Sequence, residues 1–293
     1  MDRRRRRNLA AESALIEYGL EWWHKCSGSQ VQWTARDVPL KLAGREGLHL
    51  HTIEYSSGVP YDASAPPLVL MHGFGFGAAS YYAAAPELAT RWPGRILCID
   101  TLGCANSSRP AWPYPHGHRC ELALAEAFFV DAIEAWREEM GLESMALVAH
   151  SVGAYLAIAY AERHPTRCAR LILASPVGVP HPPAGLDQLQ ADAPLAFRLV
   201  LALWRRGWSP FFLMKDLGRG RKLLHGYVTR RFADESAWIA KPELIEYFVA
   251  VWTGGPKSAG GYLHSTLLTP GGVPEGSQGE FVYARSPTGD RIP

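Results

Sequence analysis

The sequence predicts an α/β protein whose mostly parallel sheet is flanked by helices on both faces. Short apolar runs alternate with stretches of helix-forming residues from about residue 67 to residue 175, and successive strand and helix units of this kind build parallel sheets. The chain has 293 residues, of which 47% are hydrophobic, so it can bury one large core. Together these observations predict one globular core with room for an insertion.

Four runs in this region have the composition of buried strands. Each is short and apolar without a helical period, and they cover residues 67–71, 95–100, 144–148 and 168–174. A central parallel strand has this composition because both of its faces are covered. The third run is followed by residues 154–163, which are rich in helix formers, so a strand-to-helix turn is expected between the two.

That turn carries a serine. Its sequence is Ala149-His150-Ser151-Val152-Gly153, a variant of the G-x-S-x-G pattern with alanine at the first position. A serine on a sharp strand-to-helix turn exposes its hydroxyl above the sheet, and the small residues at both ends allow the turn to close. Ser151 is therefore the candidate nucleophile. His150 and Gly153 are expected to support the turn, with His150 pointing away from Ser151.

A glycine-rich loop follows the first of the predicted strands. It contains His72, Gly73, Phe74 and Gly75. Acyl transfer builds negative charge on a carbonyl oxygen, so a serine nucleophile needs fixed backbone N–H groups close by. The amides of Val152 and Phe74 are the candidate oxyanion donors. The other three loop residues are expected to shape and support the loop.

The same glycines allow a second interpretation. Residues 73–78 also fit the looser dinucleotide-binding pattern G-x-G-x-x-A, and Asp100 ends the next predicted strand, where an acid could bind a ribose. A dinucleotide site would explain neither His72 nor the turn at Ser151. We therefore favour acyl transfer and expect no cofactor.

Further segments match a known family in order along the chain. They lie at residues 49–54, 100–103, 107–110, 129–136, 171–178, 208–211, 230–232, 283–287 and 290–292. With the serine turn and the glycine-rich loop, they resemble the α/β-hydrolase fold family. Within it they are similar to the α/β-hydrolase-domain four/five subfamily and its plant and fungal phospholipid-handling relatives. The resemblance implies hydrolysis of carboxylic esters in membrane glycerolipids, or acyl transfer to a lysophospholipid, in lipid homeostasis.

The resemblance also implies a division of the chain. Residues 1–40 would form a basic and aromatic N-terminal segment, 41–178 the hydrolase core and 179–288 an inserted helical cap. Residues 289–293 would begin the rest of the core. In this family two strands after the cap lead to the triad acid and then the triad histidine, and the chain ends at Pro293 before them. The chain as given is therefore expected to be truncated and to lack its last two strands.

Two histidines inside the chain are candidates for a general base, His181 after the last predicted strand and His264 in the cap. A base must lie within hydrogen-bond reach of Ser151. The alternative function is a non-catalytic protein that binds a lipid surface and regulates a lipase, as some relatives in this subfamily do. The retained serine favours an enzyme, and the absent acid and histidine segments favour the regulator.

Basic residues concentrate in the predicted cap. Between residues 203 and 231 there are eight Lys or Arg residues and one acid, interleaved with aromatic residues. Such a mixture suits the phosphates and acyl chains of a glycerophospholipid or lysophospholipid, and no nucleic-acid motif accompanies it. A plain solvated cap is the alternative. The candidate headgroup residues are Arg205, Arg206, Arg219, Arg221, Lys222, Arg230 and Arg231.

The N-terminal segment and the composition bear on location. Arginines at 3–7 and the tryptophans at 22 and 23 suit an anionic membrane surface, and a helix packed on the domain fits equally well. No secretory signal or membrane-spanning run is recognisable. Five cysteines without metal-ligand spacing fit reduced thiols. We expect no metal and a cytoplasmic protein attached peripherally to a lipid droplet, the endoplasmic reticulum or mitochondria, with a lipase or another protein as a further partner.

Overall fold

The computed structural model describes residues 3–208, 220–232, 239, 241–253, 259–270 and 282–292. Within them the main sheet has six strands in the order β1-β2-β4-β3-β5-β6. Their bounds are β1 (Gln32–Pro39), β2 (His49–Ser56), β3 (Leu68–Met71), β4 (Ile96–Ile99), β5 (Met145–His150) and β6 (Cys168–Ala174). β2 pairs antiparallel with β1 and β4, whereas β4, β3, β5 and β6 run parallel. The predicted α/β fold is confirmed.

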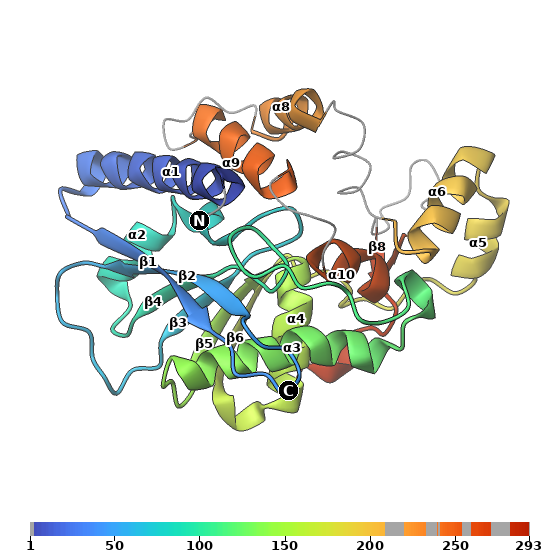
Figure 1. The fold of residues 1–293 in the computed structure, drawn as a ribbon, viewed down its shortest axis with the longest axis horizontal. Helices are drawn as coiled ribbons and strands as arrows, with labels where there is room; N and C mark the ends of the chain where they lie inside the picture. The colour runs from blue at the N-terminus through green and yellow to red at the C-terminus, as the bar shows by residue number, and fades with distance from the viewer. Residues whose placement is uncertain are drawn as a thin grey trace.

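Helices cover both faces of the sheet (Figure 1). Along β3, Leu68 and Leu70 pack into one hydrophobic cluster and Val69 and Met71 into the other, because successive side chains of a strand point to opposite faces. The first cluster includes residues of α1 (Arg3–Ser27), α2 (Ala85–Arg91) and α9 (Lys241–Thr253). The second includes residues of α3 (Leu122–Glu139) and α4 (Val152–Arg163). All four residues of β3 are consequently buried.

The cap follows β6. Its described helices are α5 (Leu186–Asp192), α6 (Leu195–Arg205), α8 (Gly220–Arg231), α9 and α10 (Ala259–Leu267). A two-stranded sheet of β7 (Leu268–Pro270) and β8 (Val282–Ala284) closes this part of the molecule. Short 3-10 helices complete the fold: η1 (Ala78–Tyr81), η2 (Gly117–Arg119), η3 (Pro165–Arg167) and η4 (Gly289–Arg291). Near the end of the described chain, Arg291 packs against the core. Its guanidinium donates hydrogen bonds to Glu126 at 2.8 Å and to Glu162 at 2.8 Å.

The N-terminal helix α1 packs on the domain. Leu15 and Ile16 are fully buried, and a Cβ added at Gly19 would lie 2.5 Å from the carbonyl oxygen of Tyr82. Figure 1 shows α9 lying alongside α1 on the same side of the sheet. Of the two interpretations of this segment, the structure shows the packed helix. No helix in the described part of the chain combines the length and apolarity needed to cross a bilayer.

The carboxyl ends of three parallel strands meet at one edge of the sheet. β3 leads into His72, β4 into Asp100 and β5 into Ser151. Ligands of α/β sheets bind at the carboxyl ends of parallel strands. The fold therefore brings the glycine-rich loop and the serine turn together at the edge where a substrate site is expected.

Candidate active site

Ser151 occupies a strained turn between β5 and α4. Its backbone has φ 54° and ψ −119°, a conformation that a non-glycine residue adopts only when its surroundings enforce it. Two hydrogen bonds do so: the Ser151 amide donates to Ala174 O at 3.1 Å, and the Val177 amide donates to Ser151 O at 3.3 Å. This is the geometry of a nucleophile elbow. The role of Ser151 as nucleophile stays a prediction.

Glycines let the elbow and the glycine-rich loop touch. A Cβ at Gly153 would lie 2.8 Å from Met71 O and would overlap His72 O. A Cβ at Gly73 would lie 3.0 Å from Ser151 Cβ. Neither position has room for a larger residue, because the obstructing atoms are backbone or belong to the elbow. Glycine is therefore needed at both positions, because a side chain at either one would collide with the elbow or with the loop.

The glycine-rich loop, residues 72–77, forms a tight turn that we call the oxyanion loop. The Phe76 amide donates to Gly73 O at 3.3 Å, and Gly75 has φ +76°, as the third residue of a type II turn requires. Phe74 is the second residue of this turn. Val152 is the first residue of α4, and the first amides of a helix have no acceptor within it. Both predicted oxyanion donors thus lie on elements that meet at Ser151.

His72 is a structural histidine of this loop. Its Nδ1 donates to Gly73 O at 2.8 Å, and its Nε2 accepts the Thr101 amide at 3.1 Å. Burial lowers the pKa of His72 to about 4, so the ring is neutral at pH 7. Both ring nitrogens are engaged, and the residue ties the loop after β3 to the loop after β4.

His150 borders the oxyanion loop. A Cβ at Gly73 would lie 2.8 Å from His150 Nδ1, and the ring packs edge-on against Phe76 with 6.2 Å between centroids. The same Cβ would lie 3.0 Å from Ser151 Cβ. His150 and Ser151 therefore both lie next to the Cβ position of Gly73.

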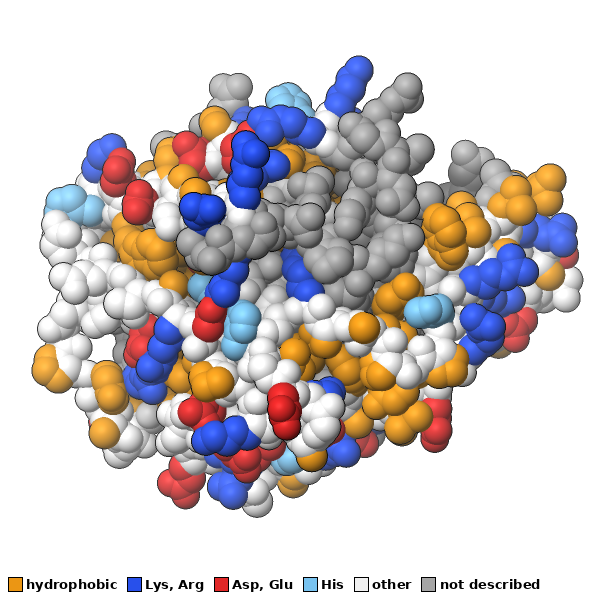
Figure 2. Space-filling view, viewed as in Figure 1, with side chains coloured by type: hydrophobic (Ala, Val, Ile, Leu, Met, Phe, Trp, Pro, Cys, Tyr) orange, Lys and Arg blue, Asp and Glu red, His pale blue; other side chains and the backbone are white. Residues whose placement is uncertain are grey.

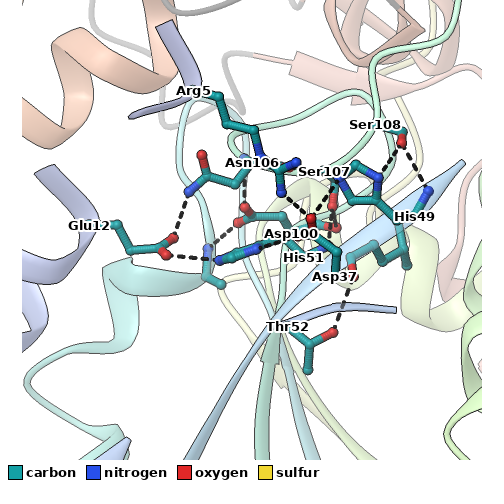
Figure 3. Close-up of polar contacts among 12 residues, drawn as sticks. Arg5, Glu12, Asp37, His49, His51, Thr52, Asp100, Asn106, Ser107 and Ser108 are labelled. Atoms are coloured by element: carbon teal, nitrogen blue, oxygen red, sulfur yellow. Dashed lines mark hydrogen bonds and ion pairs between the residues drawn. The ribbon is translucent and has the colours of Figure 1, made fainter. Parts of the chain in front are cut away.

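Figure 3 shows a polar cluster in which Glu12, His51, Asp100 and Asn106 are buried and Asp37 is more exposed. His51 Nε2 bonds to Glu12 at 2.8 Å and His51 Nδ1 to Asp37 at 2.9 Å. Glu12 also accepts from Asn106 at 2.9 Å. The members come from α1, β1, β2 and the loop after β4. No local sequence motif indicates this cluster, because most of its members are far apart in the chain.

Two cationic side chains contact the carboxyl groups of this cluster: His51 bonds to Glu12 and Asp37, and Arg5 pairs with Asp37. Burial alone would lower the pKa of His51, but hydrogen bonds to Asp37 and Glu12 outweigh it and raise the pKa to about 10. Burial raises the pKa of both Glu12 and Asp100. Asp100 accepts the amides of Ala78 at 2.6 Å and Asn106 at 2.8 Å. The cluster thereby reaches the residue that directly follows the oxyanion loop.

Of the two candidate bases from the sequence, only His181 has a described side chain. His181 lies at an exposed position, and its Nε2 is 3.0 Å from Asp290 Oδ2. This histidine therefore pairs with Asp290 and not with Ser151. The side chain of His264 lies outside the described part of the structure. Within the described residues, no group of three or more His, Cys, Asp or Glu side chains is arranged to hold a metal ion.

The predicted headgroup residues divide between two cap helices that lie apart (Figure 1). α6 carries Arg205 and is followed by Arg206, α8 carries Arg221, Lys222, Arg230 and Arg231, and Arg219 lies outside the described residues. Arg205 donates to Gln190 Oε1 at 2.7 Å, and Arg221 pairs with Glu246. Those whose side chains the structure describes therefore fall into two separate groups, one at α6 and one on α8.

Comparison with known proteins agrees with the geometry of the elbow and loop. A family model described as alpha/beta hydrolase fold matches residues 66–204. The part of the chain that this model covers therefore has the α/β-hydrolase fold, in agreement with the strand order and the elbow. The structure resembles the carboxylesterase CesB (YbfK) of Bacillus subtilis with a TM-score of 0.54 at 18% identity, covering 92% of this chain and 74% of that one. At that identity the likeness concerns the fold alone.

Two curated proteins are more similar in sequence. The chain is 42% identical over 173 residues to the (lyso)-N-acylphosphatidylethanolamine lipase of Bos taurus, covering 57% of the chain and 47% of that protein. It is 30% identical over 214 residues to the probable 1-acylglycerol-3-phosphate O-acyltransferase of Oryza sativa subsp. japonica, covering 71% of the chain and 47% of that protein. The chain spans about half the length of the curated relatives it matches. The predicted resemblance to phospholipid-handling α/β hydrolases is confirmed.

Proposed function

We propose that this protein is a serine-nucleophile enzyme that hydrolyses a carboxylic ester of a glycerophospholipid or transfers its acyl group to a lysophospholipid. The elbow at Ser151, in contact with the oxyanion loop, carries this proposal. Ser151 Oγ attacks the acyl carbon, and the amides of Val152 and Phe74 stabilise the oxyanion that forms. The two similar curated proteins, a lipase and an acyltransferase of phospholipids, support the substrate class.

Labelling with a fluorophosphonate probe tests the nucleophile. In a form of the protein that includes the expected triad acid and histidine, Ser151→Ala should abolish labelling and lower ester turnover by a factor on the order of a million, as loss of a catalytic serine does elsewhere. Ser175→Ala is the matched control, because Ser175 is more exposed than the half-buried Ser151 and also has a positive φ, of 44°. Its labelling should equal that of the unmodified protein. Equal labelling of the Ser151→Ala protein would contradict the proposal.

Product analysis then separates the two reactions. Lysophospholipid vesicles are incubated with and without an acyl donor, and free fatty acid and diacyl product are measured. Fatty acid release without a donor identifies a hydrolase, and donor-dependent diacyl product identifies an acyltransferase. Vesicle binding without labelling or turnover would instead favour the non-catalytic protein that regulates a lipase.

We further propose that α6 attaches the protein peripherally to a membrane surface. On its outward side the exposed fraction is 70% for Leu195, 59% for Leu199 and 52% for Val200. Exposed apolar side chains of this size are unusual on a helix of a folded domain. Figure 2 shows apolar side chains and basic side chains gathered at the end of the molecule formed by α5 and α6. An apolar side beside arginines suits an anionic lipid surface.

Vesicle sedimentation tests this attachment. Leu199→Glu is expected to weaken binding to phosphatidylserine-containing vesicles by about tenfold, because a leucine contact is lost and a repelled charge is added. Val59→Glu is the control, since Val59 is 71% exposed in the loop between β2 and β3, outside the helices that follow β6. Equal loss of binding in both variants would contradict attachment through α6. Which membrane is used, that of the lipid droplet, the endoplasmic reticulum or the mitochondrion, stays a prediction.

A further inference from the structure

One helix of the cap contacts the oxyanion loop residue by residue. From α9, Phe248 packs edge-on against Phe76 with ring centroids 4.9 Å apart. Trp252 packs edge-on against Phe74 at 5.6 Å. The indole nitrogen of Trp252 also donates to Gly75 O at 2.8 Å. The helix therefore touches both aromatic side chains of the loop and one of its carbonyl groups.

The contact with Gly75 bears on the shape of the turn. A Cβ at Gly75 would lie 2.5 Å from the Trp252 ring, so the indole covers the open face of this glycine. The peptide that follows Gly75 cannot rotate without losing the indole hydrogen bond. A change at Gly75 would also alter the turn that orients the neighbouring Phe74 amide. Loops with glycine at positive φ have few other restraints, because glycine is free to leave that conformation.

The other side of α9 lies against α1 (Figure 1). Leu15 and Ile16 of α1 belong to the same buried hydrophobic cluster as Leu244 and Phe248 of α9. The helix that contacts the oxyanion loop is thus itself supported by the N-terminal helix. A rigid support is what a preorganised oxyanion hole requires, because its donors must be in place before charge develops.

We propose that Trp252 is a positioning residue of the oxyanion hole. Its indole N–H holds the Gly75 carbonyl and its ring holds Phe74, so the Phe74 amide keeps its orientation towards the acyl oxygen while α9 is docked. Trp252 acts through the loop and does not touch the reacting atoms. This inference rests on the proposed acyl-transfer function, and it adds a residue from the cap that the elbow and loop motifs do not include.

The first test is Trp252→Phe, which removes the indole N–H and keeps an aromatic ring against Phe74. We expect kcat for a p-nitrophenyl ester to fall about tenfold with KM changed less than twofold, since loss of an entire oxyanion donor costs more, roughly a hundredfold to a thousandfold. The matched control is Trp92→Phe, because the Trp92 indole donates to Pro66 O at 2.9 Å at the end of α2. The Trp92→Phe protein should lose about as much thermal stability as the Trp252→Phe protein, and its kcat should not change. Equal kcat in the two variants would overturn the inference.

The second test needs no turnover. Hydrogen–deuterium exchange of a peptide covering residues 72–77 is compared among the unmodified protein and both variants. Trp252→Phe is expected to speed exchange in this peptide about tenfold, as local opening becomes easier, and Trp92→Phe to leave it unchanged. Unchanged exchange in Trp252→Phe would overturn the positioning role whatever the activity. Faster exchange in a protein whose Ser151 is not labelled would uphold the positioning of the loop and reject the proposed catalytic function.

Discussion

Glu12→Ala is expected to lower the free energy of unfolding by about 3–5 kcal/mol, the cost of breaking a buried ion pair from one side. Glu12 is 1% exposed and accepts hydrogen bonds from His51 at 2.8 Å and Asn106 at 2.9 Å. Alanine would leave the imidazolium of His51 and the amide of Asn106 buried without this partner. Urea denaturation at pH 7 measures the change.

The matched control is Glu17→Ala on the same helix. Glu17 is exposed, so its replacement should change the unfolding free energy by less than about 0.5 kcal/mol. Equal effects of the two substitutions would show that α1 is not held by the buried polar cluster. A large effect confined to Glu12 would show that this N-terminal helix is part of the folded hydrolase core.

Gly153→Ala is expected to have the largest effect near the elbow. The added Cβ would overlap His72 O and lie 2.8 Å from Met71 O. Because these are backbone atoms, α4 has to move, at a cost of about 3 kcal/mol in unfolding free energy. The movement separates the Val152 amide from the oxyanion loop, so labelling of Ser151 should slow by about a hundredfold.

Gly226→Ala serves as the control for this substitution. A Cβ at Gly226 would meet only the end of the flexible Arg230 side chain, at 3.2 Å, and the residue lies within α8. Alanine in a helix interior should stabilise it by about 1 kcal/mol without changing the labelling of Ser151. Normal labelling of Gly153→Ala would contradict the steric role that we assign to Gly153.

Much of the core could be predicted because its signals are local. The apolar run at 67–71 became β3, and the run at 144–148 became β5, because strands covered on both faces are apolar at every position. The serine turn was recognisable for the same reason: a strand, a small residue, a serine and a helix follow one another within one short segment. The basic residues of the cap could be identified, but their division between α6 and α8 could not, since it depends on how the cap helices pack.

The sequence by itself determined the α/β fold, the place of the turn at Ser151 and the glycine-rich loop, because each has a signal within a short segment of the chain. Only the tertiary structure decided what holds this site in place. Glu12 and Asn106 are 94 positions apart, and Trp252 and Gly75 are 177 positions apart. A hydrogen bond between residues so distant leaves no periodic or compositional pattern, since either partner alone is an ordinary residue of its helix or loop. Such pairs form only when folding brings their elements together and removes the water that would otherwise satisfy them.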